Sequence, residues 1–308
     1  MLLSLGLACI SVLGFGSSAV LARLGMSGLG GLRPMPGALV SLVASTLLAG
    51  TLALAFEFQA IIALPAVAMV WLLGNGILTY MGGRSQQYIA ISLVGASRVT
   101  PIVGGAALFA ALYAIMFTRF GVPGFDEHLN APIAVGTVVV VAGLALTGGN
   151  FLRQSWGRDW HSVLGYVLAL SAAACYGAAT LSGRVLSNLY GSPLIMAAGS
   201  MFFATLVLLP LFGREASQNV KSSRWATFYL FLAGFAAACA VMSLYFAVTR
   251  EGSSILVLSP IVSCNPLVTL LLARLFLRGN ETVTKELVIG TLMAVGGVTL
   301  VVVGGITG

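Results

Sequence analysis

The apolar segments of this chain occur twice in the same order, and matching landmarks stand at equivalent places in the two halves. An aromatic residue followed by glycine marks the first and the sixth segment, and a Pro-Ile-Val triplet marks the fourth and the ninth. The landmarks are Phe15-Gly16 with Tyr176-Gly177, and Pro101-Ile102-Val103 with Pro260-Ile261-Val262. A duplicated apolar unit predicts two halves of related structure, with a functional site where they meet.

Composition indicates that lipid surrounds the chain. Apolar residues make up 59% and charged residues 7% of the 308 positions, whereas soluble domains carry roughly 25% charged residues. The net charge of +7 comes from scattered basic residues that form no stripe, which excludes a nucleic-acid partner. We expect no metal site and no cofactor. The cysteines lie singly inside apolar segments, where we expect them to pack, and the two histidines lie in separate links: Cys9, Cys175, Cys239, Cys264, His128 and His161.

Ten stretches are long and apolar enough to span a bilayer, which takes about 20 residues. They cover roughly 2–24, 36–56, 64–88, 91–118, 131–151, 162–187, 193–212, 225–248, 253–277 and 286–306. The predicted fold is therefore an all-α integral membrane protein with ten transmembrane helices in two five-helix repeats. The repeats occupy 1–152 and 162–308, and a polar link at 153–161 joins them. Because five is odd, the repeats face opposite ways, and the repeat is inverted.

Basic residues are unevenly divided between the links. The links after odd-numbered segments hold eleven Lys or Arg residues, and those after even-numbered segments hold three. By the positive-inside rule, this bias puts the odd links in the cytoplasm and both termini outside.

With these landmarks the chain resembles the EamA-type transporters of the drug/metabolite transporter superfamily over nearly its full length. The resemblance rests on the duplicated five-helix unit, the aromatic-Gly pairs, the prolines of the fourth and ninth segments and the glycine-rich fifth and tenth segments. It implies an exporter-like fold with a central cavity lined largely by helices 1, 3, 4, 6, 8 and 9. It also implies cytoplasmic termini, contrary to the charge count. It names no substrate, because one fold serves many solutes.

Arg84 is the sharpest candidate for a solute-binding residue. A charge within the bilayer costs a few kcal/mol or more, so it usually faces a cavity or a partner. Tyr80, Arg84, Gln87 and Tyr88 recur at spacings of one helical turn and share a helix face. The alternative is that Arg84 lies near the helix end and reaches the interface. A guanidinium in the cavity would suit a carboxylate or phosphate.

No Asp or Glu falls inside any of the ten segments; all eight lie in links or at segment ends. A proton/cation antiporter needs a buried carboxylate that alternates between proton and cation. The sequence therefore argues against that mechanism and favours a neutral, zwitterionic or anionic solute.

Further polar and aromatic residues inside the segments are candidates for the translocation path. Each has a structural alternative: helix-to-helix bonding for the asparagines, packing for the aromatics and a simple kink for the prolines. The candidate cavity residues are Asn75, Trp71, Tyr176, Tyr245 and Asn265, and the candidate hinges are Pro101, Pro260 and Pro266.

Together these features favour a secondary transporter of small metabolites, such as amino acids or related zwitterionic or anionic solutes, that works by alternating access. Export is the expected direction. The alternative within the same fold is a translocase for lipids or lipid-linked carriers. An enzyme would need paired acid/base groups or a metal, and a channel a polar pore; the sequence indicates neither. The expected partners are membrane lipid, a small-molecule substrate and a coupling proton or counter-solute, in a bacterial inner membrane.

Overall fold

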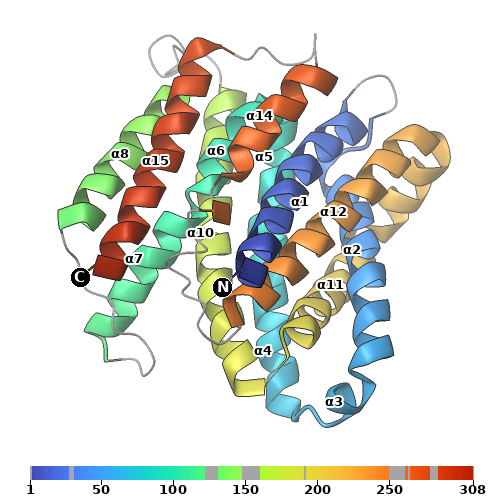
Figure 1. The fold of residues 1–308 in the computed structure, drawn as a ribbon. Helices are drawn as coiled ribbons and strands as arrows, with labels where there is room; N and C mark the ends of the chain where they lie inside the picture. The colour runs from blue at the N-terminus through green and yellow to red at the C-terminus, as the bar shows by residue number, and fades with distance from the viewer. Residues whose placement is uncertain are drawn as a thin grey trace.

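The chain folds into packed helices, seen in a computed structural model (Figure 1). The structure describes residues 2–27, 31–121, 131–147, 160–190, 192–249, 261–262, 264–277 and 284–307. Within these residues it consists of α-helices and one π-helix, η1, and contains no strand. The all-helical fold class is therefore confirmed.

The helices follow the predicted segments in order. In the first half they are α1 (Leu2–Met26), α2 (Pro34–Phe56), α3 (Phe58–Ile62), α4 (Ala66–Gly76), η1 (Ile77–Ser85), α5 (Gln86–Val94), α6 (Ala96–Gly104), α7 (Ala106–Arg119) and α8 (Ala131–Thr147). In the second half they are α10 (Trp160–Tyr190), α11 (Pro193–Ser222), α12 (Arg224–Thr249), α14 (Asn265–Phe276) and α15 (Lys285–Thr307).

Seven helical stretches of the described chain are long and apolar enough to cross a membrane. They are Leu3–Met26, Pro34–Phe56, Ala66–Val94, Ala96–Arg119, Trp160–Tyr190, Pro193–Gln218 and Arg224–Ala247. The predicted ninth segment begins at 253, but 253–260 lie outside the described residues, and α14 by itself has 12 residues. Length and composition thus mark seven candidate membrane spans within the described residues, and the ten spans stay a prediction.

Two glycines set the helix boundaries near the centre of the first half. Gly95 has a φ of 94° and separates the third span from the fourth, so the third span extends to Val94 rather than ending near Tyr88 as predicted. Only glycine adopts this backbone conformation at no steric cost. Gly105 then separates α6 from α7, and its amide bonds back to the Ile102 carbonyl. The fourth span is therefore two short helices with a break four residues after Pro101.

The helices α2 and α11 pack against each other and run antiparallel. Three pairs of residues follow their contact from end to end. Arg33, just before α2, forms a 3.1 Å ion pair with Glu215, the Thr46 and Thr205 hydroxyls lie 2.8 Å apart, and the Ser192 hydroxyl donates to the Glu57 carboxylate. Residue numbers rise along α2 as they fall along α11, which fixes the antiparallel direction.

The pair α8 and α15 lies together at one edge of the molecule, where α8 is green and α15 red (Figure 1). Two glycines bring these backbones into contact. A Cβ added at Gly143 would lie 2.5 Å from the Ala294 amide nitrogen, and one at Gly297 would lie 2.6 Å from that of Val140. The numbering again runs in opposite directions, so this pair is antiparallel too. Small residues at such contacts let helices approach closely in lipid.

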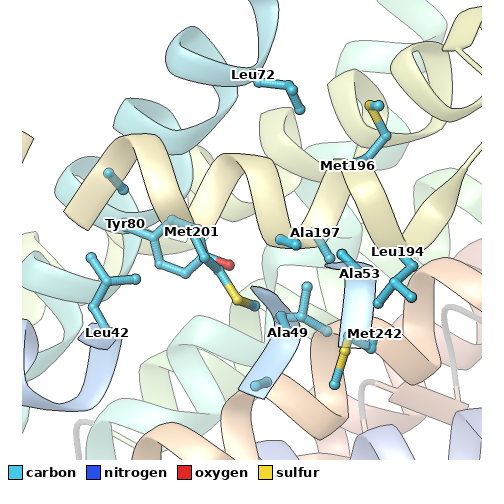
Figure 2. Packing of buried hydrophobic residues seen from close by; sticks show 14 of the residues in the cluster. Leu42, Ala49, Ala53, Leu72, Tyr80, Leu194, Met196, Ala197, Met201 and Met242 are labelled. Carbon is cyan, nitrogen blue, oxygen red and sulfur yellow. The ribbon is translucent and has the colours of Figure 1, made fainter. Parts of the chain in front are cut away.

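The largest apolar core lies between α2, α4, η1, α11 and α12. Figure 2 shows part of it, with Leu42, Ala49, Leu72, Tyr80, Met201 and Met242 among the side chains that meet there. Tyr80 is 2% exposed and belongs to this core as well as to the central cavity. The core therefore supports one wall of the cavity from behind.

We predict that Gly297→Ala lowers the melting temperature of the purified protein in detergent. The added methyl would press on the α8 backbone, and such overpacking costs about 1–3 kcal/mol. The control is Gly296→Ala, because a Cβ at Gly296 meets nothing within 4 Å. Equal melting temperatures for the two variants would contradict the close contact of α8 with α15.

Candidate functional site

A central cavity of about 150 Å³ lies between the spans of the two halves. A single buried water molecule needs a cavity of roughly 10–15 Å³. This cavity is therefore large enough for a small solute. Its walls come from α1, η1, α5, α6, α7, α10, α12, residue 262 and α14. The lining residues are Phe15, Ser18, Ala19, Thr79, Tyr80, Arg84, Gln87, Tyr88, Thr100, Val103, Gly104, Ala106, Ala110, Tyr176, Ala179, Thr180, Ala237, Val241, Leu244, Tyr245, Val262 and Asn265.

The polar wall of the cavity is carried by the π-helix η1 and the first turn of α5. π-Helical turns are rare and frequently lie at functional sites. The Ser85 hydroxyl donates to the Tyr80 carbonyl, 2.9 Å away and five residues earlier, and so bonds within this wider turn. Gly82 and Gly83 allow α10 to come close, because a Cβ at Gly83 would lie 2.5 Å from the Tyr176 ring. The segment thus presents Tyr80, Arg84 and Tyr88 to the cavity.

Arg84 is buried, with 5% of its surface exposed, and it lines the cavity. Its Nη1 donates to the Ser45 hydroxyl at 2.9 Å, and its guanidinium carbon lies 4.9 Å from the centre of the Tyr80 ring. The Tyr176 hydroxyl is a further hydrogen-bonding neighbour. Within the described chain these partners are neutral, and no carboxylate pairs with Arg84. The structure therefore places this charge in the lining of the cavity.

Two hydroxyls and an amide extend the polar wall. The Tyr176 hydroxyl donates to the Gln87 side-chain oxygen at 2.8 Å, which joins α10 to α5. The buried Tyr88 hydroxyl forms no hydrogen bond of good geometry, although Ser18 and Ser41 lie nearby. A cavity solute with an acceptor group could satisfy this hydroxyl, since an unpaired buried polar group costs free energy.

Asn75 lies outside the cavity lining, in a buried polar cluster behind Tyr245. Its amide donates to the Ser200 hydroxyl at 2.9 Å, and its oxygen accepts from Ser182 at 2.6 Å. Its side chain is also hydrogen-bonded with Tyr245, which does line the cavity. Asn75 therefore joins four helices and holds Tyr245, rather than facing solute itself.

The remaining predicted residues divide between the cavity and the scaffold. Asn265 lines the cavity and donates to the Val262 carbonyl at 2.9 Å. Trp71 does not: its side chain is 56% exposed on the outer face of α4, where an apolar ring meets lipid. Pro101 is buried inside α6. Pro266 stands in the first turn of α14, a position that suits proline. Pro260 lies outside the described residues.

Sequence reasoning did not single out Ser45, the residue that fixes Arg84. Its hydroxyl accepts from Arg84 and can donate to the Ser41 carbonyl at 3.0 Å or the Gly234 carbonyl at 2.8 Å. Ser41 and Ser45 are one turn apart on α2, so they form a small polar face on an apolar helix. This pair of serines on an apolar helix was the feature of the sequence that pointed to Ser45.

Comparison with known proteins identifies the second half of the chain. The model of the EamA-like transporter family matches residues 163–303, which confirms the resemblance drawn from the sequence. One solved crystal structure superposes on this chain with a TM-score of 0.64 and 16% sequence identity. The aligned region covers 96% of this chain and 94% of the chain in that structure. At that identity the likeness shows the fold alone. No curated protein matches. The apolar helices and the family match indicate a multi-pass membrane protein, and the match of the second half suggests a transporter rather than an enzyme.

We predict that Gly83→Ala reduces solute transport with a smaller loss of thermal stability than Gly297→Ala. The added methyl would drive the Tyr176 ring into the cavity, where it has room to move, whereas Gly297 faces fixed backbone. Transport into proteoliposomes and melting in detergent provide the two measurements. The control is Gly74→Ala on the same span, where an added Cβ meets nothing within 4 Å. Unchanged transport in Gly83→Ala would contradict the role given to this contact.

Proposed function

We propose that this chain, an EamA-like transporter by the match of its second half, is a secondary active transporter that moves small zwitterionic or anionic metabolites, such as amino acids, by alternating access. Export is the direction that the family resemblance favours, and a bacterial inner membrane is the location that we propose.

The observation that carries this proposal is the buried Arg84 guanidinium in the cavity wall. A guanidinium presents five N–H donors in a planar fork, and Ser45 takes one of them at 2.9 Å. A carboxylate fits such a fork with two parallel hydrogen bonds. The guanidinium carbon lies 4.9 Å from the centre of the Tyr80 ring, within the range of a cation–π contact. A solute carboxylate is therefore the group that this wall suits best.

The proposal includes ten membrane-crossing helices in two inverted repeats. The inverted repeat is supported by the contacts between α8 and α15, in which equivalent residues of the two helices make the same contacts. Gly143 meets Gly290 and Ala294, and Gly297 meets Gly136 and Val140. A single shift of 154 residues converts one set of contacts into the other, as a two-fold axis requires. Because α8 and α15 run antiparallel, an axis in the membrane plane relates the halves, and alternating access follows from exchanging their conformations.

We expect Arg84→Ala to lower transport at least about tenfold, because hydrogen bonds to a charged group contribute roughly 1.5–3 kcal/mol each. Arg84→Lys keeps the charge, loses the planar fork and should fall between wild type and Arg84→Ala. The measurement is uptake of four radiolabelled probes, leucine, lactate, glucose and tetraethylammonium, each into proteoliposomes preloaded with the same unlabelled probe, so that return of the empty carrier does not limit the rate. Leucine and lactate should be carried, and both should depend on Arg84.

The matched control is Arg33→Ala, which removes a guanidinium whose side chain is 80% exposed at the start of α2. Its ion pair contributes little, because exposed pairs are typically worth about 0–1 kcal/mol. Size-exclusion chromatography tests that each variant stays folded. Transport that is specific for tetraethylammonium, or that is equal in wild type and a folded Arg84→Ala protein, would overturn the proposal.

An even number of spans places both ends of this chain on one side of the membrane. We predict that protease sites added at Met1 and Gly308 are cleaved in the same population of oriented vesicles. Right-side-out and inside-out vesicles measured in parallel show which side this is, and so decide between the charge count and the family resemblance. Cleavage of the two sites in opposite populations would exclude ten spans.

A further inference from the structure

The positive charge of Arg84 is only partly stabilised when the cavity holds no solute. Arg84 is 5% exposed, and its described partners are the Ser45 hydroxyl, the Tyr80 ring and the Tyr176 hydroxyl, all of them neutral. Neutral hydrogen bonds and a ring face offset only part of the cost of burying a charge. In a cavity that is open to water, solvent supplies the rest.

Alternating access passes through a state in which the cavity is closed on both sides. Water that leaves the cavity during closure takes with it the remaining stabilisation of Arg84. A solute carboxylate restores it, since an opposite charge against a desolvated guanidinium is strongly attractive. The closed state is thus favourable with an anionic group in the cavity and costly without one.

The other titratable residues in the described lining are tyrosines: Tyr80, Tyr88, Tyr176 and Tyr245. Phenols are neutral at physiological pH, so they do not compensate the charge of the empty cavity. The return of the empty carrier is therefore the slow step of the cycle, and a solute bound from the opposite side bypasses it.

We propose that this transporter is an exchanger: it returns across the membrane with a second carboxylate-bearing solute on Arg84 far faster than it returns empty. The inference rests on the function proposed above and adds the coupling partner, a counter-solute with a carboxylate group. Arg84 acts both as a binding residue and as the charge that blocks empty return.

The test compares two rates in proteoliposomes loaded with radiolabelled lactate or leucine. One is efflux into buffer with no solute, and the other is efflux into buffer with the same unlabelled solute. Potassium with valinomycin holds the membrane potential at zero, so that charge build-up does not limit net efflux. For wild type we expect exchange to exceed net efflux by at least about tenfold, which corresponds to roughly 1.4 kcal/mol in the barrier of the empty step.

The variant Arg84→Gln removes the charge and keeps hydrogen-bond donors. We expect slower exchange and a ratio of exchange to net efflux close to one, because an uncharged empty cavity closes readily. A residue that merely supports the fold would lower both rates together and leave the ratio unchanged. The control Arg33→Gln should keep the wild-type ratio, because Arg33 lies outside the cavity lining.

The outcomes separate the two proposals. Net efflux as fast as exchange in wild type, or a wild-type ratio in Arg84→Gln, overturns the exchange mechanism and leaves the transport function standing. No Arg84-dependent transport of either probe overturns the proposed function, and the exchange mechanism with it.

Discussion

Contacts through glycine and serine hold these helices together. Lipid gives two apolar helices little reason to associate, so close packing and hydrogen bonds between helices must do so. Gly76 brings the third span against the Ser200 carbonyl of α11, and Gly234 brings α12 still closer to the Ser41 carbonyl of α2. Side-chain hydrogen bonds between helices in membranes average about 0.6 kcal/mol each. The cavity is therefore supported by many weak contacts.

The same small residues explain how the fold accommodates a charge. Because Gly234 lets α12 approach α2, the Gly234 carbonyl lies 2.8 Å from the Ser45 hydroxyl, which can donate to it while accepting from Arg84. The chain of bonds runs from the cavity wall into the scaffold.

The two halves share a framework and differ in what they present to the solute. Tyr88 and Tyr245 line the cavity from the third and eighth spans. Near Tyr88 the first half adds Arg84 and Gln87, while α12 contributes Ala237, Val241 and Leu244. The α12 part of the lining is therefore apolar apart from Tyr245, while η1 and α5 carry the charged and amide groups.

The sequence by itself determined the lipid environment, the order of the helices, the resemblance to EamA-type transporters and the residues on the Tyr80–Arg84–Tyr88 face. These follow from composition and from spacings within a single helix, which are local properties. Pairing between helices is not local. That Ser45 would hold Arg84, that Asn75 would bond behind Tyr245 and that Trp71 would face outward depended on how the helices are rotated against one another. The π-helix at Ile77–Ser85 lies between Asn75 and Tyr88, so the residues of this span do not follow the spacing of one regular α-helix. A span of any apolar sequence satisfies lipid, so only packing against neighbouring helices could decide which side chains face the cavity.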